Sequence, residues 1–196
     1  MNNLRTILTI ITGVFVISAS ADNIPRPEYP RPQFERNEWI NLNGTWTYQF
    51  DFGQSGVENG LSKSEGFADE ITVPFCPESE LSGVGHKDFI PAIWYHRNIS
   101  IPQAWDGKHI ILHFGGVDYR SQIFIDGKKA FEHFGGAASF MVDITNFVKA
   151  GSTHHLIVYA QDDVRSRLQP GGKQSRRLNS YECFYTRVTG IWSTVW

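Results

Sequence analysis

The chain has 196 residues, of which 41% are hydrophobic and 19% are charged, so it carries enough apolar side chains to build a core. Its 18 basic and 20 acidic residues leave a formal net charge of −2 at pH 7. A charge so close to zero provides no field that would draw in nucleic acid or an anionic membrane surface. We therefore expect no nucleic-acid partner, and a partner that is neutral or only mildly charged.

The N-terminus has the three parts of a secretory signal peptide at residues 1–21. Arg5 supplies a lone positive charge, Ile7–Ile17 an apolar run, and Ala19–Ala21 a cleavage site of small residues. The apolar run is about half as long as the roughly 20 residues that a membrane-spanning helix needs. This pattern predicts a periplasmic or extracellular product with no membrane span after cleavage. The remaining chain has the size of one domain.

Two stretches of low hydrophobicity are predicted to lie outside the core. Residues 22–38 contain four prolines with arginines between them, namely Pro25, Pro27, Pro30 and Pro32. Proline fixes φ and lacks a backbone N–H, so this composition predicts an extended leader without a core of its own. Residues 54–69 are rich in Gly, Ser and Glu, which predicts a long exposed loop.

From Leu42 onward the dominant hydrophobic period is two, which is the period of a β-strand with one buried and one solvated face. It starts with Trp46, Tyr48, Phe50 and Phe52, which alternate with polar residues. The same alternation recurs in four later runs, Tyr95–Ile101, Ile110–Phe114, Ser121–Ile125 and Leu156–Ala160. Strand-sized runs separated by turn residues predict an all-β sandwich.

Turn residues divide these runs. Asp126 and Gly127 lie between two apolar runs, and a type I′ turn needs φ > 0 at both central residues, so we expect a tight β-hairpin there. Strands are expected to end at prolines, which have no N–H for a ladder, namely Pro74, Pro77, Pro91 and Pro102. Short helical turns are expected only near residues 143–148, with Asp143 or Thr145 as the cap, and around residues 102–105.

The two cysteines, Cys76 and Cys183, lie far apart in the sequence and far from the cleavage site. An oxidising compartment permits a disulfide between them. Two buried thiols are the alternative, because free cysteine behaves as a small apolar residue. The sequence leaves both alternatives open.

The residues give no complete catalytic or metal site. The close acidic pairs, Glu78 with Glu80 and Asp162 with Asp163, are interpreted as turn or solvent-facing residues, because acidic residues are common in turns. Two histidines on one strand face, at positions 109 and 113, would lie about 13 Å apart, too far to share a metal ion. We therefore expect neither a metal nor a cofactor. Three tryptophans are interpreted as core aromatics, namely Trp46, Trp94 and Trp192.

Six motifs occur in a fixed order along the chain. They are Asn41–Trp46, Val73–Gly83, Trp94–Tyr95, His113–Tyr119, Ile125–Gly127 and Thr189–Trp192. In this order they resemble the N-terminal sugar-binding domain of glycoside hydrolase family 2, which includes β-galactosidases, β-glucuronidases and β-mannosidases. The resemblance covers residues 39–196 and implies a jelly-roll, galactose-binding-like β-sandwich.

The resemblance also implies where catalysis takes place. In that family an immunoglobulin-like sandwich and a (β/α)₈ barrel follow, and two barrel glutamates hydrolyse O-glycosyl bonds with retention. The catalytic residues are therefore expected beyond Trp196, and this chain alone is expected to be inactive. Residues 185–196 resemble a strand that has only begun, which predicts a domain truncated at its C-terminus. The resemblance also implies that the full-length glycosidase acts in carbohydrate catabolism, and it is compatible with a homo-oligomer of that enzyme.

In the family, a loop of this sandwich reaches the sugar pocket. By position, the resemblance implies substrate-binding roles for His96, Asp163, Tyr185 and Arg187, whose polar groups and ring suit a hydroxyl-rich ligand. Phe184 departs from the pattern, because some β-galactosidases and β-glucuronidases have an aspartate six residues before the Gly-Ile pair. The identity of the sugar is therefore left open.

Two other classes of protein remain as alternatives. A stand-alone carbohydrate-binding module would need an exposed aromatic platform, and an adhesive β-sandwich would bind no sugar. Four arginines also allow two interpretations, namely Arg165, Arg167, Arg176 and Arg177. We interpret them as a solvated loop, because charge runs usually face water. The alternative is a cluster that faces an acidic sugar.

Overall fold

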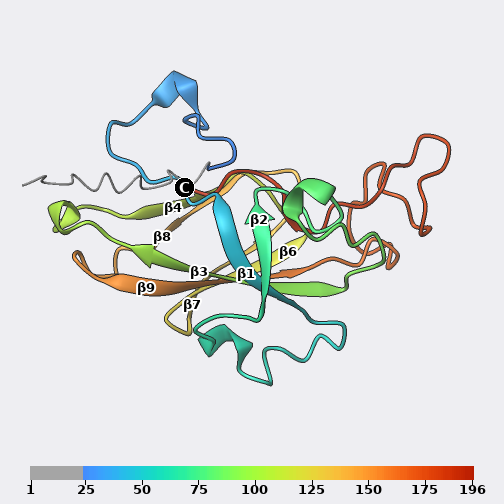
Figure 1. Cartoon of the computed structure of the whole chain (residues 1–196), viewed down its shortest axis with the longest axis horizontal. Coiled ribbons are helices and arrows are strands. Elements are labelled where there is room, and N and C mark those ends of the chain that lie inside the picture. Colours follow the sequence, from blue (N-terminus) through green and yellow to red (C-terminus); the bar gives the residue numbers. More distant parts are fainter. Residues whose placement is uncertain (1–23) are drawn as a thin grey trace, which may run out of the picture.

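The structure is a computed structural model that describes residues 24–196, so the predicted signal peptide lies outside the described residues (Figure 1). Ten β-strands and four short 3₁₀ helices make up the regular structure of this range, which contains no α-helix. Within residues 24–196 there is also no helix that is long and apolar enough to span a bilayer. The prediction of an all-β fold is confirmed.

Six strands form the larger sheet, which is antiparallel throughout and has the spatial order β2-β1-β3-β9-β6-β7. Their bounds are Asp69–Val73 (β2), Gly44–Phe50 (β1), Ala92–Ser100 (β3), Thr153–Gln161 (β9), Arg120–Ile125 (β6) and Lys128–Phe134 (β7). β3 and β9 lie at the centre and pair along their full length. Strand β2 ends directly before Pro74, as predicted, whereas β3 starts directly after Pro91, so the prediction that a strand ends at Pro91 is wrong.

The second layer consists of shorter antiparallel strands. β4 (Ile111–Phe114) pairs with β8 (Phe140–Asp143), and β5 (Val117–Asp118) pairs with β10 (Gly190–Ile191). Figure 1 shows β4 and β8 lying over β3 and β9, so the two layers form a sandwich.

The residues that follow β10 complete this second layer. The Trp196 N–H donates to the carbonyl of His113 over 3.1 Å, and the His113 N–H donates to the carbonyl of Trp196 over 2.8 Å. On the other side of the same segment, the Leu42 N–H donates to the carbonyl of Val195 over 2.9 Å. The segment from Gly190 to Trp196 therefore lies between β4 and the residues that precede β1.

The main hydrophobic core fills the space between the layers. Trp46 and Tyr48 of β1 and Tyr95 of β3 point into it, together with Phe114 of β4 and Ile191 of β10. Burying one large apolar side chain contributes about 1.5–3 kcal/mol, so this alternation is a main source of stability. The period of two predicted the first four of these positions, but Phe52, which it also placed on the buried face, is 59% exposed.

A smaller apolar cluster covers the outer face of the larger sheet. It contains Ala92, Trp94, Phe124, Ile157 and Tyr159. Leu61 and Phe67 of the segment at residues 54–69 pack against it, and η2 (Leu61–Lys63) lies in the same segment. The prediction that this whole segment is an exposed loop is therefore wrong. The central strands bury both faces, and the outer face needs a cover.

Asp51 directly follows β1 and is one of the polar residues that alternate with its aromatic residues, so the period of two predicts that it is solvated, but it is buried. Its carboxylate accepts hydrogen bonds from the main-chain N–H groups of Ser55 and Gly56 and from the Trp94 indole over 3.0 Å. Three donors make this burial tolerable, because a buried carboxylate without partners would be very costly.

The predicted turns are largely confirmed. Asp126 and Gly127 join β6 to β7 with φ values of 47° and 76°. η4 (Gln103–Trp105) is the helical turn expected after Pro102. Near residues 143–148 there is a hydrogen-bonded turn in place of a helix, in which Asp143 Oδ1 accepts from the main-chain N–H of Thr145. A further 3₁₀ turn, η3 (Glu80–Ser82), follows β2.

The leader lies against the second layer. It contains η1 (Pro32–Phe34), none of whose residues is buried. The Asn43 side chain donates to the carbonyl of Pro25 over 3.0 Å, and Tyr29 packs edge-on against Trp39. The described part of the leader therefore has no core of its own and is held by the domain.

Trp192 does not lie in the core, so the prediction for this third tryptophan is wrong. Trp46 and Trp94 are buried, whereas Trp192 is 39% exposed. Its ring lies against Gly116, and its indole N–H donates to the carbonyl of Gly136 over 2.7 Å. It follows β10 on the outside of the second layer, so the core does not enclose it.

Candidate functional site

The loops at one end of the sandwich enclose a small cleft of about 110 Å³. The connection between β9 and β10, residues 162–189, is the longest of these loops, and Figure 1 shows it extending beyond the sheets in orange and red. The residues before β3 form the opposite wall. Residues that line the cleft include Gln54, Phe89, Pro91, Asp162, Asp163, Arg165, Arg187 and Thr189.

Arg187 fixes the shape of the β9–β10 loop. Its side chain is 2% exposed, and its guanidinium donates to the carbonyls of Ser175, Arg177 and Leu178 within the loop. It also donates to the carbonyl of Lys87, across the cleft wall. One buried guanidinium thus joins four main-chain carbonyls, because its planar fork presents five donors.

Phe89 lies between two arginines at this cleft. The guanidinium carbons of Arg187 and Arg165 are 4.1 Å and 4.0 Å from the centre of its ring. Cation–π contacts of this kind stabilise by about 0.5–1 kcal/mol at exposed sites and by more when the cation is desolvated. Arg187 is the desolvated member, whereas Arg165 is exposed.

Two buried carboxylates contact Thr189 behind the cleft, and a third buried carboxylate, Asp118, lies near them. Glu78 accepts a hydrogen bond from the Thr189 N–H, and Asp162 accepts one from its hydroxyl. Asp118 accepts from the Gln174 amide over 2.7 Å. Desolvation raises the pKa of all three, and the neighbouring acids raise those of Asp162 and Asp118 further, to about 7 and about 6.

Glu78 and Asp162 were interpreted as turn or solvent-facing residues; Glu78 does lie in a turn, but neither residue faces solvent. Each is only 4% exposed. Their burial depends on contacts with Thr189, which is distant in the sequence, so no local pattern could have revealed it. Their neighbours, Glu80 and Asp163, do face solvent as predicted.

The structure brings two of the four predicted substrate-binding residues to this cleft. Asp163 and Arg187 both line it, and Asp163 is exposed. Tyr185 is 50% exposed and lies two residues before Arg187, but it is not part of the lining. Its main chain pairs with Lys173 and Ser175 of the same loop.

His96 lies elsewhere. It is four residues along β3 from Ala92, about 13 Å from the cleft end of the strand, and it is buried on the outer face of the larger sheet. Its ring contacts His155 over 3.0 Å and Thr47 over 3.3 Å. Burial and the neighbouring His155 lower the pKa of His96. The structure therefore does not group His96 with the other three residues.

The four arginines that were interpreted as a solvated loop, namely Arg165, Arg167, Arg176 and Arg177, are all exposed. Arg177 lies over the ring of Tyr181 at 4.1 Å, and Arg165 contacts Phe89 as described. This exposure agrees with the interpretation as a solvated loop.

The cysteines and histidines form no metal site within residues 24–196, where no group of three His, Cys, Asp or Glu side chains could hold an ion. Cys76 and Cys183 are free thiols rather than a disulfide. Cys183 is exposed, so the alternative of two buried thiols does not hold for it. Burial and the nearby Glu78 raise the pKa of Cys76 to about 12.

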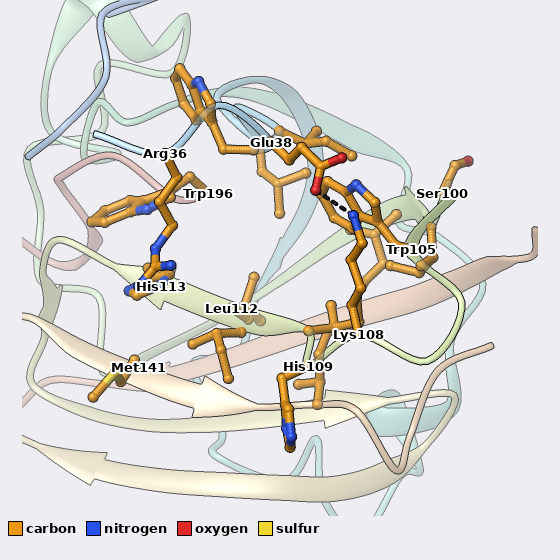
Figure 2. Close-up of a pocket in the computed structure, with 18 of the residues that line it drawn as sticks. Arg36, Glu38, Ser100, Trp105, Lys108, His109, Leu112, His113, Met141 and Trp196 are labelled. Atoms are coloured by element: carbon orange, nitrogen blue, oxygen red, sulfur yellow. Dashed lines mark hydrogen bonds and ion pairs between the residues drawn. The ribbon is translucent and has the colours of Figure 1, made fainter. Parts of the chain in front are cut away.

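A larger cavity of about 450 Å³ lies under the leader, beside the other end of β3 (Figure 2). Ser100, the last residue of β3, lines it, whereas the small cleft contacts Pro91 before the first residue. None of the four predicted substrate-binding residues lines this cavity.

Two antiparallel layers around one core, with long loops at one end, define an all-β sandwich domain. The sequence profile described as "Glycosyl hydrolases family 2, sugar binding domain" matches residues 39–167, and the chain belongs to this family. The sandwich is accordingly the jelly roll of that domain, as the sequence motifs implied.

Known relatives are much longer than this chain. The β-glucuronidase of Felis catus is 30% identical over 135 residues, which is 63% of this chain and 20% of the relative. The β-galactosidase of Thermoanaerobacter pseudethanolicus is 26% identical over 171 residues, which is 80% of this chain and 20% of the relative. The chain therefore spans about a fifth of the length of these relatives.

Solved structures agree on the fold. A β-glucuronidase from Ruminococcus gnavus, in complex with a C6-substituted uronic isofagomine, superposes with a TM-score of 0.67. The identity is 22%, and the match covers 83% of this chain and 29% of that chain. At this identity the likeness concerns the fold alone.

Proposed function

We propose that this chain is the N-terminal accessory domain of a secreted family 2 glycosidase that cleaves β-glycosides with retention. The observation that carries the proposal is the match to the family's sugar-binding domain in a chain that spans about a fifth of its glycosidase relatives. Two glutamates outside this chain act as acid/base and nucleophile. The chain alone does not hydrolyse glycosides.

The role of the domain is to shape the rim of the active site through the β9–β10 loop. Arg187 holds that loop in place through four main-chain carbonyls, which supports a positioning role for it. Asp163 and Tyr185 are exposed on the same loop and offer a carboxylate and a ring with a hydroxyl to a sugar. His96 is buried on another face and takes no part in this contact.

The proposal is tested by isolating the native product from the periplasm or the medium. Its intact mass is compared with the 22.3 kDa of this chain, and its activity is measured on chromogenic β-glucuronide, β-galactoside and β-mannoside. We expect a product several times heavier that hydrolyses at least one of the three. A product no heavier than this chain, without activity, would contradict the proposal, and sugar affinity in that product would favour a stand-alone binding module.

The contact residues are tested in the active product. Asp163→Ala and Tyr185→Phe are expected to raise KM or lower kcat/KM for the preferred glycoside. His96→Gln is the matched control, because its side chain lies away from the loop. Equal effects of all three variants would contradict a contact between the β9–β10 loop and the sugar.

A further inference from the structure

The larger cavity opens directly onto the main core. Leu42, Ile101 and Leu112 line it, and all three belong to the core cluster between the layers. In Figure 2, Arg36 and His113 lie on one side of the cavity, the paired Glu38 and Lys108 on the other, and Leu112 at its base. A volume of about 450 Å³ falls within the usual range for small-molecule pockets, so size alone does not identify the occupant.

The main chain of β4 forms one wall of this cavity and presents an unpaired edge. In an antiparallel strand, the N–H and C=O groups of alternate residues point to the same side. The N–H and C=O of His113 both pair with Trp196. The N–H and C=O of Ile111, two residues earlier, therefore point to the same side of β4. Strand β8 pairs from the other side, and within residues 24–196 no main-chain partner of Ile111 occurs on the cavity side.

The charged side chains at the cavity are largely committed to each other. The Lys108 ammonium pairs with the Glu38 carboxylate over 2.5 Å, and His109 lies 3.5 Å from the carboxylate of Asp143. Among the described residues, the β4 wall leaves unpaired the main-chain N–H and C=O of Ile111 and the buried Nδ1 of His113. An extended peptide supplies the donor and acceptor that such an edge lacks.

We infer that this cavity is a socket for a β-strand, and that its occupant is the polypeptide that follows Trp196 in the longer enzyme. The inference rests on the proposed function, which supplies that polypeptide. The chain direction fits, because the Trp196 segment already runs antiparallel to β4 and points along it toward Ile111.

The register of the occupant follows from the residues already in place. Since Trp196 and His113 form a hydrogen-bonded pair, the second residue beyond Trp196 pairs with Ile111. Val195 is fully buried in the core, whereas the Trp196 ring stacks on His113 at 4.8 Å. The first and third residues beyond Trp196 therefore point into the core, onto Leu112 and Ile101, and are apolar.

Amide hydrogen exchange tests the socket in the longer product. In the 196-residue chain, we expect the Ile111 amide to exchange about tenfold faster than the hydrogen-bonded amide of His113. In the longer product, we expect the Ile111 amide to exchange as slowly as the His113 amide. Fast exchange of Ile111 in the longer product would overturn the inference. Charged residues at both inward positions beyond Trp196 would overturn it as well.

A second arm separates this inference from the proposed function. If the native product proves no longer than this chain, the proposed function fails, and the socket is tested with a synthetic peptide of alternating Val and Thr. We expect the peptide to slow exchange of the Ile111 amide about tenfold, and the same peptide with proline at its centre to leave it unchanged, because proline has no N–H. Equal effects of the two peptides, or no effect of either, would overturn the socket.

Discussion

Asp162→Asn should make the domain more stable at pH 8 and flatten its dependence on pH. Asp162 is 4% exposed, and desolvation, followed by the charge of Asp118, raises its pKa from 3.8 to about 7. Because the folded state holds the proton more tightly than the unfolded state, the wild-type chain loses stability as pH rises from about 4 through 7. The shift corresponds to about 4 kcal/mol for the ionised form.

The amide in Asp162→Asn removes this ionisation and retains most of the hydrogen bonds. Its oxygen accepts from Gln169, as Oδ1 of the carboxylate does over 2.5 Å. Its NH₂ group donates to the Thr189 hydroxyl, whose own proton turns to the unpaired Oε1 of Glu78. One rearranged hydrogen bond costs about 1 kcal/mol, so we expect a net gain of about 2–3 kcal/mol at pH 8 and a difference within about 1 kcal/mol at pH 5.

Urea unfolding at pH 5, 6, 7 and 8, followed by tryptophan fluorescence, measures these differences. Asp163→Asn is the matched control, because Asp163 is the neighbouring acid in the sequence and is exposed. Parallel pH profiles for the wild type and Asp162→Asn would refute the assignment of the raised pKa to Asp162.

Three further substitutions test individual contacts. Asp51→Ala leaves the Trp94 indole and two main-chain N–H groups without their acceptor, so we expect a loss of about 3 kcal/mol in urea unfolding, and Asp51→Asn should lose less than half of that. Gly127→Ala forces φ 76° on a residue with a Cβ and should cost about 1–2 kcal/mol in thermal unfolding; an unchanged Tm would contradict the turn geometry. Arg187→Met should expose the β9–β10 loop to trypsin about tenfold faster, while Arg165→Met, which also removes a Phe89 contact, should not.

Local patterns predicted the strands and the hairpin because both depend on short-range geometry. A period of two fixes which side chains of β1 share a face, and two residues with φ > 0 fix the turn at Asp126 and Gly127. The same patterns could not reveal that β3 and β9 bury both faces. That property depends on Leu61 and Phe67, which reach the outer face from a segment with little apolar character.

The candidate site was predicted only in part for a similar reason. The family resemblance pointed to Asp163 and Arg187, and both residues lie on one loop and line the cleft. His96 lies on β3, and the residues that its ring contacts belong to the neighbouring strands β1 and β9. These strands are distant in the sequence, so the residues next to His96 could not reveal the contacts. The buried acids Glu78 and Asp162 were missed because their shared partner Thr189 is distant in the sequence from both.

The place of the segment from Gly190 to Trp196 sets an order of events during synthesis. All six strands of the larger sheet are complete at Gln161, whereas the second layer gains its central segment only when Val195 can pair with Leu42. At about 5–20 residues per second, the ribosome needs a few seconds to add the residues between these points. Because β4, β5 and β8 precede Gln161, the apolar face of the larger sheet lacks only this central segment of its cover during that interval. The nascent chain then exposes apolar surface that a chaperone would cover. Cells with less chaperone should therefore show more aggregation of this domain.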